Sequence, residues 1–234
     1  MITRKKVLVI GDVMLDTYFT GEVKRISPEA PVPVFRKMGE RSVLGGAANV
    51  AVNLVAAGHN VFMMSIVGKD ETGERLLDTF YAQGINTDLV MSINRHTTEK
   101  TRFLASNNQQ VLRLDVEDTQ PLSNEACIWL LEKFKVMVKS FDMILISDYL
   151  KGLLTYEFTQ GIIQISRENH IPVIIDVKDP MYEKYAQATL IKPNLKEVRE
   201  LTKMKARTDA EIIEASEMLR IKCDSKYVCT NYMW

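Results

Sequence analysis

The segment Gly45-Gly46-Ala47-Ala48-Asn49 and the earlier run VLVIGDVMLD, residues 7–16, together decide how this chain is expected to fold. The earlier run is apolar and β-branched up to Gly11, which is typical of a buried parallel strand, and Asp16 follows at its tip. The later segment opens a small-residue apolar helix, predicted over residues 44–57. We therefore predict that a carboxylate and a glycine-rich helix start meet at two neighbouring strand ends.

The chemistry of these two strand ends favours a small-molecule site. Glycines let a ligand approach the main chain closely, and the amides and dipole of a helix N-terminus attract oxygen-rich groups. A polyhydroxylated and phosphorylated ligand fits this combination. The alternative is structural: Gly45 and Gly46 form a tight turn, and the alanines that follow pack the helix closely on the sheet.

The rest of the chain alternates between predicted strands and helices, which indicates a parallel sheet with crossover helices. The predicted strands cover residues 61–67, 89–92, 143–147, 173–177, 189–191 and 227–230, and the predicted helices cover residues 71–83, 123–139, 155–169 and 208–221, with another helix beginning near Asn194. Ligands of open α/β sheets bind outside the carboxyl ends of the strands. We expect Asp16, Asp148, Asp176 and Asn194 at that edge.

Composition narrows the class of partner. The 30 Lys and Arg residues balance the 30 Asp and Glu residues, so no global field draws the chain to nucleic acid or to an anionic membrane. Cys127, Cys223 and Cys229 lack metal-ligand spacing and are predicted to be buried, and the histidines are scattered. Because no charged-then-apolar leader opens the sequence, we expect a cytoplasmic protein whose partner is a small molecule.

Three segments in order carry a family resemblance: GDVMLD at residues 11–16, RISPEAPVPV at residues 25–34 and GGAANVAVNL at residues 45–54. They resemble the N-terminal half of the ribokinase-like (PfkB) carbohydrate kinases. The proline-dense RISPEAPVPV segment is most similar to the branch that phosphorylates D-glycero-D-manno-heptose 7-phosphate at its anomeric hydroxyl, on the route to ADP-heptose and lipopolysaccharide. Further resemblances are TEKTR (98–102), QQVLRLD (109–115), SDYLKG (147–152), DVK (176–178) and PNLKE (193–197).

The resemblance implies a fold and a domain plan. It implies an α/β, ribokinase-like, doubly wound and mostly parallel sheet with an inserted small β-sheet lid. Residues 1–234 would form one such domain lacking its C-terminal part, and residues 17–38 and 98–114 would form the lid. A lid excludes water, which competes with the acceptor hydroxyl for the phosphoryl group. Because lids of this family often mediate dimer contacts, a homodimer through the lid is also expected.

The resemblance also implies a sugar-phosphate site. Asp16, Gly45, Gly46 and Asn49 would hold sugar hydroxyls. Arg25 and Arg102 would bind the distal phosphate of the sugar, because a forked guanidinium contacts phosphate through two hydrogen bonds. The alternatives are that Asp16 belongs to a turn or a helix cap and that the two arginines are solvated residues of an exposed lid.

A second set of residues is implied to serve ATP and magnesium. Asn194 and Glu197 would orient Mg²⁺ through water near the ATP phosphates, since magnesium keeps much of its hydration and takes oxygen ligands. Asp176 and Lys178 would lie beside the transferred phosphoryl group, and Asp148 is a weaker metal candidate. The alternatives are that Asn194 and Glu197 are a helix N-cap with its first-turn acid, and that Asp148 and Lys151 form an ion pair within a turn.

One departure from the family bears on activity. Kinases of this family carry a second glycine-rich signature, Gly-Ala-Gly-Asp, whose amides bind the transferring phosphate and whose Asp is the catalytic base. The last glycine here is Gly161, so no catalytic residue is assigned, and we expect this chain alone to be weak or inactive. The alternatives are a kinase for another sugar, such as a fructose phosphate, ribose or a nucleoside, and a non-catalytic sugar-phosphate binder. A dinucleotide-binding domain is disfavoured because no G-x-G-x-x-G follows the first strand.

Overall fold

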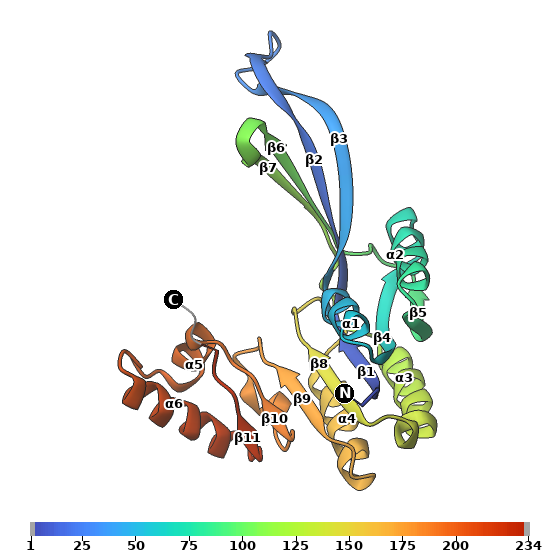
Figure 1. The fold of residues 1–234 in the computed structure, drawn as a ribbon, viewed down its shortest axis with the longest axis vertical. Coiled ribbons are helices and arrows are strands. Elements are labelled where there is room, and N and C mark those ends of the chain that lie inside the picture. Colours follow the sequence, from blue (N-terminus) through green and yellow to red (C-terminus); the bar gives the residue numbers. More distant parts are fainter. Residues whose placement is uncertain (1–2, 232–234) are drawn as a thin grey trace.

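The strands form two separate sheets in the computed structural model, which describes residues 3–231 (Figure 1). Residues 1–2 and 232–234 of the expected domain lie outside the described part. The larger sheet has seven strands in the order β11-β10-β9-β8-β1-β4-β5, and its paired strands run parallel. The smaller sheet has four strands in the order β3-β2-β6-β7. The predicted α/β fold with an added small sheet is confirmed.

The bounds of the elements follow the predicted alternation closely. The large sheet contains β1 (Lys6–Gly11), β4 (Asn60–Gly68), β5 (Asn86–Ile93), β8 (Met143–Ser147), β9 (Val173–Asp176), β10 (Leu190–Ile191) and β11 (Tyr227–Val228). The helices are α1 (Ala47–Ala56), α2 (Glu71–Ala82), α3 (Asn124–Met137), α4 (Tyr156–Glu168), α5 (Leu195–Thr202) and α6 (Asp209–Lys222). Short 3-10 turns occupy Ser106–Asn108, Val138–Ser140 and Tyr182–Tyr185. Among residues 3–231, no helix is both long and apolar enough to cross a bilayer.

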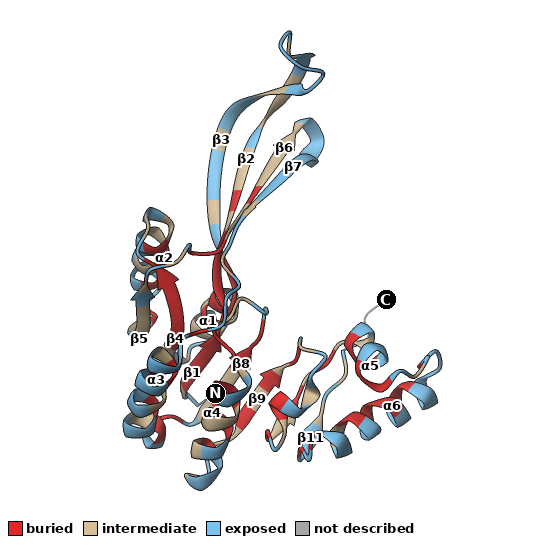
Figure 2. Cartoon of the chain, turned by 180° about the vertical axis from the view of Figure 1, so that it is seen from behind, coloured by how far each residue is buried: buried red, intermediate tan, exposed pale blue. Residues whose placement is uncertain are grey.

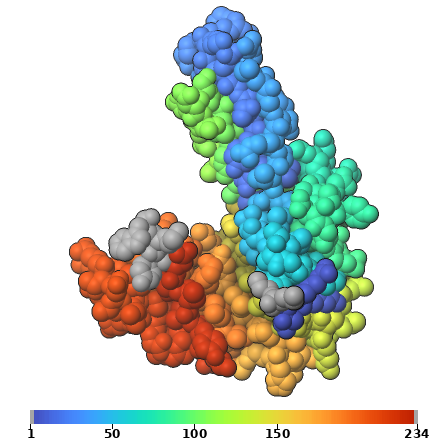
Figure 3. All heavy atoms as spheres, viewed as in Figure 1, coloured from blue at the N-terminus to red at the C-terminus, as the bar shows by residue number. Residues whose placement is uncertain are grey.

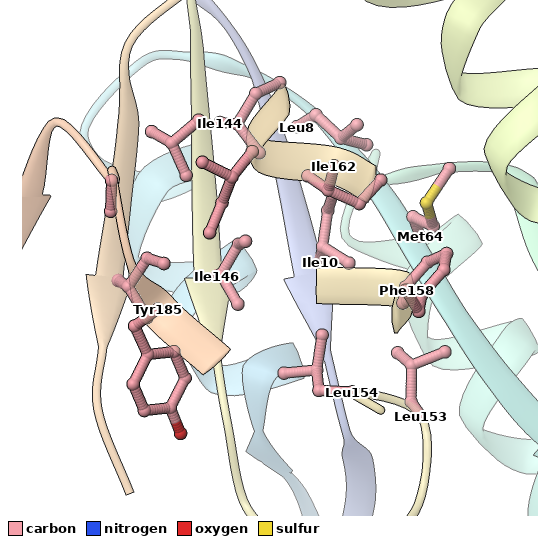
Figure 4. Packing of buried hydrophobic residues seen from close by; sticks show 14 of the residues in the cluster. Leu8, Ile10, Met64, Ile144, Ile146, Leu153, Leu154, Phe158, Ile162 and Tyr185 are labelled. Atoms are coloured by element: carbon pink, nitrogen blue, oxygen red, sulfur yellow. The ribbon is translucent and has the colours of Figure 1, made fainter. Parts of the chain in front are cut away.

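Helices pack on both faces of the large sheet because alternate side chains of β1 enter two different cores. Leu8 and Ile10 point into a core built with α3 and α4, where they meet Phe158 and Ile162 (Figure 4). Val7 and Val9 point the other way, toward α1 and α2. A central strand that is apolar on both faces is the expected signature of a parallel sheet covered on both sides.

Side-chain caps start several helices where the sequence predicts them. The Asp70 carboxylate accepts from the Gly73 amide at 2.8 Å at the start of α2, and Ser123 and Thr155 cap α3 and α4. Thr208 and Glu211 form a capping box at the start of α6. Each such cap satisfies amides that the first helical turn leaves without partners.

The smaller sheet projects from the core as a long arm, which we call the lid (Figures 1 and 3). It consists of β2 (Val13–Ile26), β3 (Pro33–Gly46), β6 (Glu99–Ala105) and β7 (Gln109–Val116). The β2–β6 pair is parallel, and the β2–β3 and β6–β7 pairs are antiparallel. Burial is concentrated at the base of the arm, and its far end is exposed (Figure 2).

Two local predictions at the base of the lid are wrong. The core strand β1 ends at Gly11 as predicted, but Asp16 does not lie at its tip, because β2 begins at Val13 and Asp16 lies inside this lid strand. The helix begins at Ala47 rather than near residue 44, because Leu44, Gly45 and Gly46 complete β3 by pairing with β2. Gly46, with a φ of 61°, turns the chain from strand to helix.

One cysteine departs from its prediction. Cys127 and Cys223 are buried as expected, and burial raises the pKa of the Cys223 thiol to about 12. Cys229 follows the short edge strand β11 and is exposed. The prediction that all three cysteines are buried is therefore wrong.

Candidate functional site

A hollow of about 390 Å³ lies where the lid joins the core, and it contains most of the predicted sugar site. It is lined by Met14, Asp16, Tyr18, Val43, Leu44, Gly45, Gly46, Asn49, Lys100, Arg102 and Tyr149. Five of the six predicted sugar-site residues meet here, from β2, the end of β3, the start of α1 and β6. The hollow therefore combines a carboxylate, an amide side chain and two cations beside the Gly45-Gly46 turn.

Asp16 and Arg102 are in direct contact in this hollow. Arg102 Nη1 donates to Asp16 Oδ1 at 2.6 Å, and this bond is the main cause of a raised pKa of the Arg102 guanidinium. The two residues share a face of the lid because Asp16 pairs with Lys100, and Tyr18 with Arg102, across the parallel β2–β6 ladder. The same register brings Lys100 into the hollow. Lys100 was not predicted as a site residue, although the two-residue alternation of a strand places its side chain on the same sheet face as Arg102.

Gly45 and Gly46 lie where neighbouring atoms leave no room for a side chain. A Cβ on Gly45 would lie 2.2 Å from Asp16 Oδ2, and a Cβ on Gly46 would lie 2.4 Å from the Asp12 carbonyl oxygen. Gly46 also has a positive φ, which side-chain-bearing residues rarely adopt. The structural alternative for Gly46, a tight turn, is thus realised, while Gly45 leaves room for the carboxylate of the site.

Arg25 is not part of this hollow. It lines a separate depression of about 390 Å³ near the far end of the lid, with Glu22, Lys24, Val34, Phe35 and Arg36. At about 3.3 Å per residue along β2, Arg25 is roughly 30 Å from Asp16. Within one chain, Arg25 and Arg102 therefore do not face a common phosphate.

The residues predicted for ATP and magnesium gather near the ends of β9 and β10. Asn194 Oδ1 accepts from the Glu197 amide at 2.9 Å, and Glu197 Oε2 accepts from the Asn194 amide at 2.7 Å. This capping box of α5 is the structural alternative for both residues. Glu197 Oε1 lies outside the box, 3.5 Å from Lys178 Nζ. Asp176 Oδ1 is 2.7 Å from Nζ of Lys192, a cation that the sequence analysis missed.

This donor set fits a hydrated magnesium ion and the phosphates of a nucleotide. A capping-box carboxylate keeps lone pairs that can accept from metal-bound water, and Lys178 and Lys192 supply positive charge beside it. Residues 3–231 contain no group of three His, Cys, Asp or Glu side chains arranged to enclose a metal ion. Because the Glu197 carboxylate is engaged in the capping box, the donor set suits an ion that retains most of its water.

The structure places Asp148 in a different role from the two considered for it. Its Oδ2 accepts from Lys184 Nζ at 2.6 Å and from the Tyr185 hydroxyl at 2.7 Å, and its Oδ1 accepts from the Leu150 amide at 2.8 Å. The alternative, an ion pair with Lys151, is not formed, because Lys151 pairs with Glu117 at 2.7 Å. With both carboxylate oxygens engaged by protein donors, the geometry gives no support to Asp148 as a metal ligand.

Two further residues near the hollow were missed. Asp12 is buried at the end of β1 and binds main-chain amides of the turn after β8. Tyr149, in that turn, forms part of the wall of the hollow. Both belong to quoted motifs, GDVMLD and SDYLKG, but nothing in either motif says that the two segments touch.

Comparisons with known proteins agree with this geometry. The family model described as pfkB family carbohydrate kinase matches residues 4–231. Bifunctional protein HldE of Gluconobacter oxydans (strain 621H) is 43% identical over 215 residues, covering 92% of this chain and 45% of that protein. Bifunctional protein HldE of Helicobacter pylori (strain ATCC 700392 / 26695) is 39% identical over 217 residues, covering 92% of this chain and 47% of that protein. The chain thus spans about half the length of these curated relatives.

Solved structures share the fold at low sequence identity. Ribokinase of Arabidopsis thaliana, complexed with ribose and ATP, has a TM-score of 0.74 and 19% identity, covering 98% of this chain and 72% of that one. Phosphofructokinase-2 of Escherichia coli, in complex with fructose-6-phosphate, has a TM-score of 0.76 and 19% identity, covering 99% and 74%. These likenesses establish the architecture and leave the substrate to be argued from the site.

Proposed function

Because the chain belongs to the pfkB family of carbohydrate kinases, we propose that it binds D-glycero-D-manno-heptose 7-phosphate and serves transfer of the ATP γ-phosphate to the anomeric hydroxyl. The RISPEAPVPV segment supports this substrate, as does the similarity to proteins named HldE. We place the reaction in the cytoplasm, where ATP is available, as a step toward ADP-heptose and lipopolysaccharide.

The observation that carries the proposal is the make-up of the hollow at the base of the lid. Asp16 and Asn49 offer an acceptor and an amide to sugar hydroxyls, and Gly45 leaves the space that the Asp16 carboxylate occupies. Lys100 forms no ion pair within residues 3–231, so its ammonium is available to a sugar phosphate. Arg102 binds Asp16 through Nη1 and can extend its remaining donors to the same phosphate.

The donor side of the reaction is proposed at the ends of β9 and β10. Lys178 and Lys192 would neutralise ATP phosphate charge, Asp176 would hold Lys192 in place, and Asn194 and Glu197 would bind water of a magnesium ion. Such an ion, when bound, offsets the charge that develops on the transferring phosphate. The protein groups contribute position and charge, which is most of what phosphoryl transfer requires.

Arg25 keeps a proposed role only if a second copy of the chain is present. Because it lies roughly 30 Å along β2 from Asp16, it can reach a phosphate in the hollow only from a partner chain. A homodimer formed through the lids would allow this, and the lid is the element that carries Arg25 away from its own core (Figure 1).

We further propose that a polypeptide of these 234 residues binds sugar phosphate but transfers phosphate slowly. The family's Gly-Ala-Gly-Asp signature is not within the sequence. Without its anion-binding amides and base, the two subsites can hold their ligands but lack the groups that act at the reacting atoms.

Calorimetric titration of the purified chain with D-glycero-D-manno-heptose 7-phosphate, fructose 6-phosphate and ribose tests this proposal. We expect the heptose phosphate to bind most tightly, and an ADP-release assay on the same sample to stay near background. Lys100→Ala should weaken heptose phosphate binding by roughly tenfold, since it removes a charge-assisted contact. Lys133→Ala, on the exposed face of α3, is the matched control and should leave binding unchanged.

Equal binding of the three ligands would contradict the heptose assignment and favour another sugar. Absence of binding to all three would contradict a sugar site at the hollow. Rapid ADP release that depends on the heptose phosphate would show that these 234 residues already contain a complete catalytic apparatus.

A further inference from the structure

Tyr149 stands between the two proposed subsites. It follows Asp148 at the end of β8 and lines the hollow with Asp16, with 37% of its surface exposed. Burial raises the pKa of its phenol, the Asp176 charge raises it further, and Lys178 and Lys192 act in the opposite direction. The ring is therefore within electrostatic reach of the phosphate-side cluster while it forms part of the sugar-side wall. None of the hydrogen bonds within residues 3–231 uses its hydroxyl, whereas its backbone amide is bonded.

The main chain of Tyr149 is held by a buried carboxylate from another strand. Asp12, at the end of β1, is 3% exposed. Its Oδ2 accepts from the Tyr149 amide at 3.0 Å and from the Lys151 amide at 3.1 Å, and its Oδ1 accepts from the Leu153 amide at 3.3 Å. Burial raises the pKa of Asp12, and the three amides oppose that rise. Burying a carboxylate costs free energy, so we infer that these three main-chain amides require a strong acceptor at Asp12.

The turn that Asp12 binds has an uncommon backbone. Leu150 has a φ of 57° and Gly152 has a φ of 94°, both in the left-handed region. A side chain on Leu150 in this region is strained unless surrounding contacts fix the conformation. The Asp12 carboxylate is one such contact, because it binds the amides on both sides of Leu150.

Other contacts fix the same turn from two further directions. Asp148 is tied to Lys184 and Tyr185, and Arg95 donates to the Lys151 carbonyl oxygen at 3.0 Å. Arg95 also donates to the carbonyl oxygen of Asp118, just after the last lid strand β7. The backbone of this turn is therefore held by Asp12 after β1, by residues between β9 and β10, and by Arg95. These contacts set the direction of the Tyr149 side chain.

We propose that Tyr149 contacts the bound sugar phosphate where the two subsites meet, its phenol donating to a ligand oxygen, and that Asp12 is the positioning residue that holds Tyr149 there. Neither residue is among those that the family resemblance assigned to the site. The inference rests on the proposed function, because it requires a sugar phosphate in the hollow. Neither residue makes or breaks a covalent bond of the ligand.

A double-mutant cycle tests this pair by titration with D-glycero-D-manno-heptose 7-phosphate. Tyr149→Phe should raise Kd by roughly fivefold to tenfold, the usual effect of one lost ligand hydrogen bond. Asp12→Asn should raise Kd by a similar factor, because an amide has one acceptor oxygen where the carboxylate uses two. The double variant should bind no more weakly than the weaker single variant, since both changes remove the same contact.

Two controls separate positioning from loss of stability. Tyr81→Phe, on the exposed surface of α2, should leave Kd unchanged. Asp70→Asn removes a carboxylate that also binds main-chain amides, those of Gly73 and Thr97, and should lower the melting temperature without changing Kd. Amide hydrogen exchange at residues 149–153 should accelerate in Asp12→Asn and not in Asp70→Asn. Asp12→Glu, which keeps the charge but moves the oxygens, is the second variant if Asp12→Asn does not fold.

The outcomes are distinct. An unchanged Kd for Tyr149→Phe overturns the proposed contact, and effects that multiply in the double variant overturn the claim that Asp12 acts through Tyr149. If the wild-type chain itself does not bind the heptose phosphate, the proposed function fails, and the contact with Tyr149 fails with it. The exchange measurement then decides separately whether Asp12 fixes the turn.

Discussion

At the scale of single residues, the sugar hollow depends on the absence of one methyl group. A Cβ on Gly45 would lie 2.2 Å from Asp16 Oδ2 and 2.9 Å from the Met14 side chain. Asp16 would have to leave its position and its bond with Arg102. We therefore predict that Gly45→Ala weakens heptose phosphate binding by roughly tenfold or more, the loss expected for a displaced charged group.

Gly58→Ala is the matched control for this prediction. Gly58 has a φ of 90°, but a Cβ there would meet no atom within 4 Å. The substitution should cost about 1 kcal/mol of unfolding free energy through backbone strain and leave the titration unchanged. Equal binding by wild type and Gly45→Ala would show that the position of Asp16 does not matter to the ligand.

At the scale of elements, two side chains at the start of α5 have both a structural role and a proposed binding role. Asn194 and Glu197 close a capping box at the start of this helix, and the proposed function also gives them magnesium-bound water. Thr208 and Glu211 form the same box on α6 with no proposed ligand nearby. Asn194→Ala and Thr208→Ala should each lower the free energy of unfolding by about 1 kcal/mol, the usual effect of a lost N-cap.

Only one of these two N-cap variants should change the binding of the nucleotide. We predict that Asn194→Ala reduces the magnesium-dependent part of ATP binding and that Thr208→Ala does not, as measured by titration with ATP in the presence of Mg²⁺ or EDTA. If both variants lose stability alike and bind Mg-ATP alike, Asn194 is a cap and nothing more.

The same comparison shows what could be predicted from the sequence. Helix starts and short core strands were predicted closely, because Ser123, Thr155 and Thr208 each act on an amide only three residues away. The lid strands β2 and β3 span residues 13–46, well beyond the predicted segment 17–38, whereas β6 and β7 nearly match the predicted segment 98–114. Their length is set by pairing between β2 and β3 and between β2 and β6, which no local pattern reports.

For the candidate site too, features within one motif could be predicted and contacts between distant motifs could not. Residues within one motif, such as Asp16 or Gly45, were found because each motif has its own chemistry. Contacts between motifs were not found: Asp148 with Lys184, Asp12 with the Tyr149 amide, and Lys100 beside Asp16. The fold brings these partners together across many residues of sequence, so only the three-dimensional arrangement reveals them.

At the scale of the whole molecule, the two faces of the lid have different chemistry. The face of Asp16, Tyr18, Lys100 and Arg102 lines the hollow. The opposite face is polar near the core and apolar farther out, where Phe103 pairs with Leu112 and stacks edge-on against Phe19 and Phe35. Near the core this face is contacted by α2, where Arg75 donates to Ser42 and Thr72 to Glu99. Farther out, Leu112 and Leu114 are 55% and 51% exposed.

The proposed homodimer would bury this exposed apolar part of the sheet against the lid of a second copy. Leu112→Glu and Leu114→Glu should each shift the chain from dimer to monomer in sedimentation-velocity runs at micromolar concentration, because each places a charge in a buried apolar contact. Ile128→Glu on α3, where the native side chain is 62% exposed, should leave the dimer intact.

The monomeric variants should also lose any contribution of Arg25 to heptose phosphate binding, so Arg25→Ala should weaken binding in the wild type and have no effect in Leu112→Glu. A wild-type chain that sediments as a monomer, or a dimer that both lid variants preserve, would exclude the lid as the interface and Arg25 as a residue of the site.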